Sequence, residues 1–158
     1  GRINTCRLLL SCPNGSIMKN EADGAGMTAL HLAAQNGHLK ILTILIQRGA
    51  LIVRDNKDNT PLHRAAENGH TACVHLLLAM HGVLLDCLNL DGNTALHLSA
   101  SNGHAAVVRM LLTAGAGLIY NASGRGFFDD VISKGHLSVA EAVVNHERYP
   151  LLISLVFC

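Results

Sequence analysis

The sequence contains no tryptophan, and aromatic residues make up only 3% of its 158 residues. A core formed by this chain therefore consists mainly of Leu, Ile, Val and Ala, which suits small helices that pack closely. Apolar residues make up 49% of the sequence, so a chain of this length buries the core of one domain. These proportions predict an all-α fold.

The chain also lacks any run of Lys or Arg, and its formal net charge is only +1. Binding to phosphate backbones or to anionic lipid needs a concentrated positive surface, so we expect no nucleic acid partner. The longest terminal apolar run, Leu151–Phe157, is far shorter than the roughly 20 residues of a membrane-spanning helix, and the first residues lack a signal-type apolar stretch. We therefore expect no direct membrane insertion of this segment.

The cysteines form no CxxC pair and no regular disulfide framework, and their number is odd. This usage is typical of a reducing, cytosolic compartment. For Cys73 the favoured interpretation is packing as a small apolar residue, and the reactivity of the others is left open. The five cysteines are Cys6, Cys12, Cys73, Cys87 and Cys158.

A tetrapeptide that begins with Thr recurs three times along the chain. It reads Thr-Ala-Leu-His at 28–31, Thr-Pro-Leu-His at 60–63 and Thr-Ala-Leu-His at 94–97, and subtraction of the first residue numbers gives steps of 32 and 34 residues. A Gly-His pair follows nine residues after each Thr, beginning at Gly37, Gly69 and Gly103. Repeats of this length indicate a stack of similar supersecondary units.

The chemistry of the repeat predicts two helices per unit. The Thr hydroxyl caps the N-terminus of a first helix, where the first amides lack partners. An Ala pair keeps one face of that helix thin, and Gly permits the turn into a second, apolar helix. The residues assigned to this structural repeat are Thr28, His31, Gly37, Thr60, His63, Gly69, Thr94, His97 and Gly103.

These motifs resemble the ankyrin-repeat family, which implies a solenoid of stacked helix-turn-helix units with projecting finger loops. Each full copy contains two histidines, one that ends the tetrapeptide and one in the Gly-His pair. In such repeats the first His is expected to bond the Thr three residues before it, and the second is expected to satisfy groups at the turn between helices. A fourth copy is degenerate, because Gly126–Asp129 replaces the Thr-to-His tetrapeptide. The predicted division is 1–22 (half of a truncated repeat plus loop), 23–54, 55–88, 89–120, 121–150 (degenerate repeat) and 151–158 (start of a linker or truncated end).

Particular stretches also resemble the last ankyrin repeats of TRPA-type transient receptor potential cation channels. The resemblance implies a cytoplasmic module that belongs to a homotetramer and is linked to gating. That family's main electrophile-sensing cysteines lie beyond the repeats, so Cys158 is assigned no such role. The stretches are Gly1–Cys6, Asn20–Asp23 with Gly26–Thr28, Gln35–His38 with Gly49–Leu51, Asp91–His97 and His146–Tyr149.

Ten histidines invite a metal or catalytic interpretation, but the repeat accounts for their spacing better. Zinc ligands stand two to five residues apart with Cys or carboxylate partners, and no such cluster is present. The sequence also has no glycine-rich phosphate loop and no nucleophile with a base and an orienting group. We expect no metal, no cofactor and no catalytic residue.

The leading hypothesis is therefore a non-catalytic module that binds protein through its finger loops and the concave side of its first helices. The partner is a cytosolic protein, a channel subunit or a neighbouring repeat. A freestanding adaptor or inhibitor and an enzyme with a diffuse active site are the alternatives, and each named residue could equally be solvated without a partner. The binding candidates are Leu32, Gln35, Asn36, Arg64, Glu67, Asn68, Leu98, Ser101 and Asn102, with Lys57, Asn59, Leu90 and Asn93 at finger tips.

Overall fold

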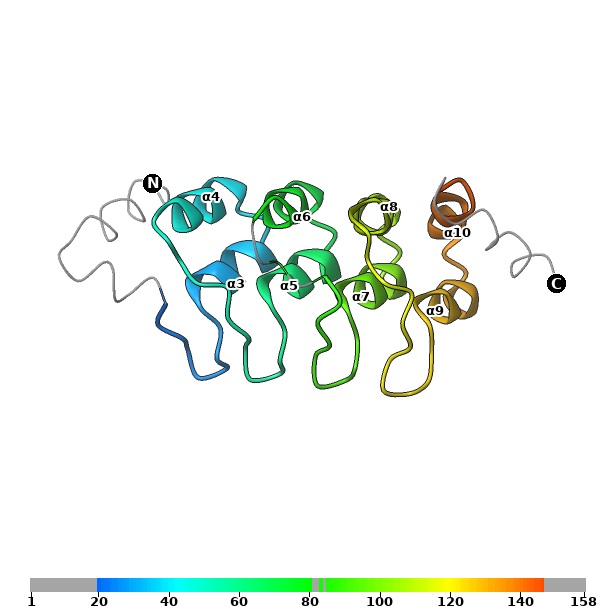
Figure 1. Ribbon diagram of the computed structural model, residues 1–158, viewed down its shortest axis with the longest axis horizontal. Coiled ribbons are helices and arrows are strands. Elements are labelled where there is room, and N and C mark those ends of the chain that lie inside the picture. Colours follow the sequence, from blue (N-terminus) through cyan, green and yellow to red (C-terminus); the bar gives the residue numbers. More distant parts are fainter. Residues whose placement is uncertain (1–19, 81–82, 84, 147–158) are drawn as a thin grey trace.

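A computed structural model describes residues 20–80, 83 and 85–146 (Figure 1). The predictions that concern residues 1–19, Cys6, Cys12, Cys158 and the segment 151–158 lie outside this part. The described residues form helices in pairs and no strand, as the composition predicts. The helices are α3 (Ala29–Gln35), α4 (Leu39–Gln47), α5 (Pro61–Glu67), α6 (Thr71–Leu78), α7 (Ala95–Ser101), α8 (Ala105–Ala114), α9 (Phe127–Lys134) and α10 (Leu137–Val144).

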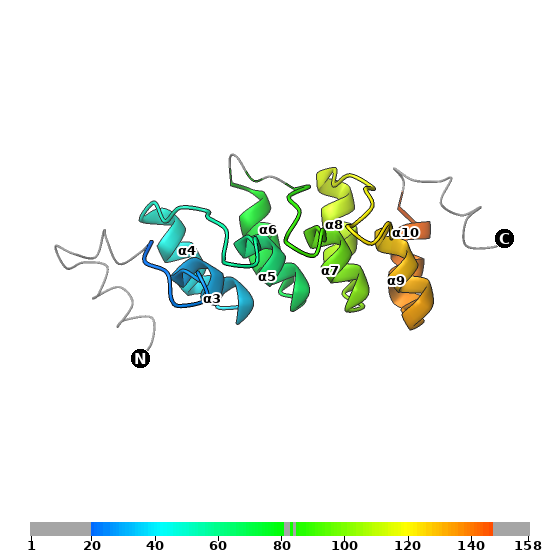
Figure 2. The same ribbon diagram turned by 90° about the horizontal axis from the view of Figure 1, so that it is seen from below.

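The helices form two layers in an elongated stack. The first helices α3, α5, α7 and α9 lie side by side in an inner layer, and α4, α6, α8 and α10 form the outer layer (Figures 1 and 2). Loops project beyond the inner layer in one direction and form the predicted fingers. Each predicted segment from 23 to 150 contains one helix pair, while the exact repeat boundaries remain predictions.

Small residues allow the layers to approach closely. Ala34, Ala66 and Ala100 occupy the same position in successive inner helices, and all three are fully buried. Leu42, Val74 and Val108 from the outer helices are also fully buried. These residues belong to one core cluster that runs through successive repeats, so the stacking of neighbouring units contributes to the apolar burial.

The turns between paired helices need glycine. Gly37 and Gly69 have φ of +68° and +71°, in the left-handed region. A Cβ at either position would also lie 2.6 Å from a ring nitrogen of His70 or His104 in the next repeat. Glycine is therefore required by both backbone conformation and space.

Within the described residues, the longest helix is α8 with 10 residues. No helix in this part of the chain is long and apolar enough to cross a membrane.

Candidate protein-interaction surface

The predicted bond between each Thr and His is present in all three full copies. The Nδ1 atoms of His31, His63 and His97 lie 3.0, 2.8 and 2.8 Å from the Thr Oγ1 atoms. The backbone N–H of each Thr also donates to the same ring nitrogen, at 3.2–3.3 Å. Since Nδ1 accepts, the neutral ring carries its proton on Nε2.

The opposite ring nitrogen ties an inner helix to the following finger loop. His31 Nε2 donates to the carbonyl of Asn59 at 3.0 Å, and His63 Nε2 lies 3.0 and 3.1 Å from the carbonyls of Cys87 and Asn93. In the third copy, His97 Nε2 is buried and makes no hydrogen bond of normal geometry within the described residues. It faces the carbonyls of Arg125 and Ile119 in the finger before α9.

Burial keeps these three rings neutral. It lowers the pKa of His31, His63 and His97 from the usual 6.5, more than the neighbouring carbonyls and carboxylates raise it. A neutral Nε2–H donor and Nδ1 acceptor are what the Thr and finger contacts require. These contacts are consistent with the structural role that the repeat pattern predicts for the three histidines.

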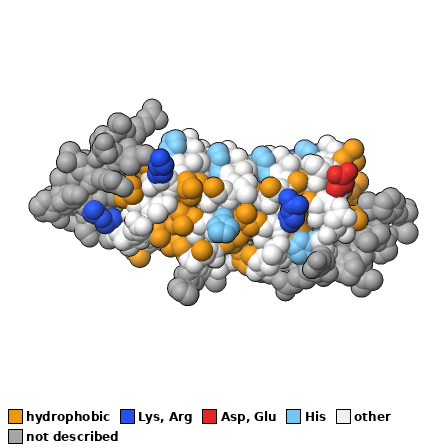
Figure 3. Space-filling model, turned by 90° about the horizontal axis from the view of Figure 1, so that it is seen from above, with side chains coloured by type: hydrophobic (Ala, Val, Ile, Leu, Met, Phe, Trp, Pro, Cys, Tyr) orange, Lys and Arg blue, Asp and Glu red, His pale blue; other side chains and the backbone are white. Residues whose placement is uncertain are grey.

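The His of the Gly-His pair acts across the repeat boundary in three of the described copies. Nε2 of His70 bonds the carbonyl of Gln35 at 2.9 Å, His104 bonds that of Glu67 at 2.9 Å, and His136 bonds that of Ser101 at 3.0 Å. The prediction placed these rings at a turn between helices, and the structure shows that the turn is the one in the preceding repeat. Figure 3 shows a row of histidine side chains along one edge of the outer face.

Each finger loop is held by one Asp or Asn side chain. The Oδ1 atom of Asp55 accepts from the backbone N–H groups of Lys57 and Asn59, both at 2.9 Å. The same two-bond arrangement recurs in the other three described fingers. Sequence analysis missed this feature, although its signal is an Asp or Asn five residues before each Thr or Gly126. The four residues are Asp23, Asp55, Asn89 and Asn121.

Two residues expected at finger tips instead connect neighbouring fingers. Asn59 is buried, with 4% of its surface exposed, and its Oδ1 accepts from Asn89 Nδ2 at 2.9 Å. Half-buried Asn93 accepts in the same way from Asn121, also at 2.9 Å. The expectation of an exposed Asn59 is wrong because the amide can bond a finger that lies one repeat away, which spacing within one loop does not reveal.

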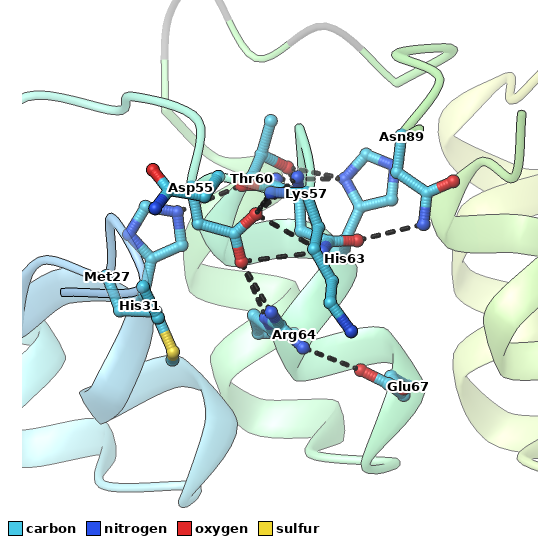
Figure 4. A network of polar contacts seen from close by, with 12 residues as sticks. Met27, His31, Asp55, Lys57, Thr60, His63, Arg64, Glu67 and Asn89 are labelled. Carbon is cyan, nitrogen blue, oxygen red and sulfur yellow. Dashed lines mark hydrogen bonds and ion pairs between the residues drawn. The ribbon is translucent and has the colours of Figure 1, made fainter. Parts of the chain in front are cut away.

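An ion-pair network joins the second finger to α5 (Figure 4). Asp55, whose side chain is only 1% exposed, accepts from Arg64 Nε at 3.1 Å and pairs with Arg64 Nη2. Arg64 also pairs with Glu67 at 3.4 Å. Burial alone would raise the pKa of Asp55, but the hydrogen bond from Arg64, those from the Asn59 and Lys57 amides and the Arg64 charge together lower it.

The other candidates differ in exposure. Leu32, Lys57, Leu90, Asn36, Asn68 and Asn102 are exposed, whereas Gln35, Arg64, Glu67, Leu98 and Ser101 are half-buried. The three exposed Asn residues follow the inner helices, and each donates its side-chain amide to the carbonyl four residues earlier at 2.8–2.9 Å. Ser101 accepts from Lys134 and is thereby linked to α9.

The described residues contain one small apolar cavity, and more open hollows of about 240 and 500 Å³ lie along the outer helices. The cavity of about 130 Å³ is lined by Ile52, Leu62, Leu77 and Cys87, with Arg54 as the charged side chain in its wall, and ligand pockets are generally larger, about 300–1,000 Å³. Burial raises the pKa of Cys73, which keeps that thiol protonated and favours packing. The described residues contain no group of three or more His, Cys, Asp or Glu side chains that could hold a metal ion.

Comparison with known proteins agrees with this architecture. The sequence model of ankyrin repeats, which contains three copies, matches residues 1–84 and 50–122. The chain belongs to the ankyrin-repeat family. Its Thr-His bonds, thin Ala faces and finger loops are therefore features of an ankyrin stack.

The ankyrin chain is also similar to much longer proteins. It is 42% identical over 145 residues to the transient receptor potential cation channel subfamily A member 1 of Drosophila melanogaster. The aligned stretch covers 92% of this chain and 12% of that protein. It is 50% identical over 56 residues to the human protein of the same name, which is 35% of this chain and 5% of that protein. The chain thus spans about an eighth or less of the relatives that it matches.

Proposed function

We propose that this ankyrin stack is a non-catalytic, protein-binding regulatory module from the cytoplasmic part of a TRPA-type cation channel. The observation that carries the proposal is the 42% identity to the Drosophila channel over 92% of the chain. In this assignment the module works within a homotetramer and carries regulation, while the pore belongs to another part of the protein.

The proposed binding surface runs across the concave side of the inner helices and onto the fingers. Four residues after each Thr stand Leu32, Arg64 and Leu98, so apolar and basic side chains alternate across adjacent repeats. The Asp55 carboxylate fixes Arg64 from one side, and Leu90 on the third finger is 65% exposed. A preformed row of this kind gives a partner little ordering entropy to overcome.

The coding sequence around this segment tests the channel assignment directly. We expect the open reading frame to continue, downstream of Cys158, into six apolar spans of roughly 20 residues each. A reading frame that encodes only this stack would contradict the channel assignment and favour a freestanding adaptor or inhibitor.

A domain exchange tests the regulatory role. The matching 145-residue stretch of the Drosophila channel is replaced by this chain, and currents are recorded. We expect the exchanged channel to assemble and open, and we expect the recorded currents to change when Leu90 is replaced by Ser. The matched control is Leu118→Ser, which alters a Leu that is 38% exposed outside the fingers. Equal responses of the two variants would contradict a finger-loop surface.

A further inference from the structure

The last helix pair, α9 and α10, lies at the end of the described stack (Figure 1), and large apolar side chains on both helices are exposed. Ile132 on α9 is 61% exposed and Leu137 on α10 is 75% exposed. Phe128, Ala140 and Val144 beside them are half-buried. The end face is defined here as Phe128, Ile132, Leu137, Ala140 and Val144.

Comparison by register shows that this face is built like the core. Ile132 stands six residues after Gly126, as Ala100 stands six after Thr94, and Ala100 is fully buried. Ala140 and Val144 correspond to Val108 and Leu112 of α8, which are fully buried too. Val139 and Val143, on the side of α10 toward α8, are themselves fully buried. The end face therefore consists of positions that are buried in the preceding repeat, and a further element packed on it would bury them here.

That covering element is not another regular ankyrin repeat. The inner helices of the described repeats approach one another over Ala34, Ala66 and Ala100, and Ile at this position is too large for the same approach. In addition, Asp129 replaces the His whose Nε2 would donate to a following finger, and a carboxylate cannot donate. Both substitutions mark α9 as the last inner helix of its kind.

The chain itself carries a suitable occupant a few residues further on. Leu151–Phe157 reads Leu-Leu-Ile-Ser-Leu-Val-Phe, in which Ser154 is the single polar residue. From Val144 to Leu151 are seven residues, which span roughly 23 Å when extended. Packed helices lie about 8–10 Å apart, so the segment reaches the end face easily.

We propose that the end face is the docking site of Leu151–Phe157 of the same chain, which closes the ankyrin stack with an apolar element in place of a further repeat. Exposed apolar faces of this kind are sites of association, and terminal units of a solenoid need a cover. The proposal is independent of the channel assignment.

Hydrogen exchange on the complete 158-residue chain tests the docking. The variants are Ile132→Asp on the face and Leu155→Asp in the segment, each alone and combined. We expect each single variant to raise exchange rates about tenfold both in α10 and in residues 151–157, because a desolvated charge opposes the contact. The double variant should add little, since both changes remove one interaction. Leu90→Asp, on a 65% exposed finger residue, is the control and should leave both regions unchanged.

Three results would overturn the proposal. The first is that Leu155→Asp leaves exchange in α10 unchanged. The second is that residues 151–157 of the unaltered chain exchange as fast as an unfolded peptide. The third is a dimer in sedimentation equilibrium that Ile132→Asp dissociates and Leu155→Asp does not, which would assign the face to a second copy.

Discussion

The central repeats and the last repeat differ in the residues that cap their first helices and in the residues that bond these helices to the next finger. In the centre, Thr60 is the N-cap of α5, and His63 bonds both that Thr and the next finger. In the last repeat Gly126 occupies the N-cap position of α9, and Asp129 Oδ2 accepts from the Gly126 N–H at 2.6 Å. Asp129 thus retains the local cap and gives up the long-range bond. The comparison separates what a helix needs to begin from what a stack needs to continue.

The largest expected effect comes from removing a central histidine. His63→Ala should lower the free energy of unfolding by about 3 kcal/mol, because it leaves a cavity and unpaired polar groups in the core. The matched change in the last repeat, Asp129→Ala, should cost only about 0.5–1 kcal/mol, the value of a cap. Urea unfolding followed by circular dichroism measures both, and equal losses would contradict the comparison.

Loss of the central arginine should have the next largest effect. Arg64→Ala leaves the Asp55 carboxylate buried without its cation and should cost about 2 kcal/mol. In the last repeat Arg125, 48% exposed, pairs with Asp130 at 2.7 Å. Arg125→Ala should stay within about 0.5 kcal/mol of the unaltered protein. If Arg125→Ala lowered the free energy of unfolding more than Arg64→Ala in the same urea experiment, burial of the ion pair would not explain its contribution to stability.

Glycine replacements should separate backbone strain from crowding. Gly69→Ala meets both a φ of +71° and the His104 ring, whereas Gly135→Ala meets a φ of +70° and open space. We expect a loss of about 2 kcal/mol or slightly less for Gly69→Ala and about 1 kcal/mol for Gly135→Ala. Thermal unfolding midpoints of the two variants test this difference, and the same midpoint for both would mean that the His104 ring moves away at no cost.

Mild acid should have the smallest effect. The folded pKa values of His31, His63 and His97 are lowered, so below about pH 6.5 the unfolded chain binds more protons than the folded one. Stability is therefore expected to be flat above about pH 7 and to fall gradually as the pH drops below about 6.5, as urea midpoints would record. His97→Gln should reduce this pH dependence, because Gln does not titrate; an unchanged dependence would exclude His97 as a contributor.

Much of this architecture could be predicted from the residues of a single repeat. Thr28 with His31, and Gly37 after the Ala pair, act within a few residues, so their spacing is visible in the sequence. The bonds from Asn89 to Asn59 and from His70 to Gln35 join residues 30 and 35 positions apart. Such partners are decided by how one repeat stacks on the next, and spacing within a loop cannot show whether an Asn is exposed or joined to its neighbour.

The Asn-Gly pairs at the ends of α3, α5 and α7 are a sequence type that deamidates readily in flexible chains. Deamidation at such a pair requires the Gly backbone nitrogen to attack the Asn side-chain carbonyl carbon. The fold opposes this at Asn36, Asn68 and Asn102, because each side chain is held to the carbonyl four residues earlier. Each Gly N–H is likewise donated to a helix carbonyl, at 3.1–3.3 Å. Isoaspartate at these three sites in a stored sample would therefore accumulate only as fast as the helix ends open, and would record which repeat opens most often.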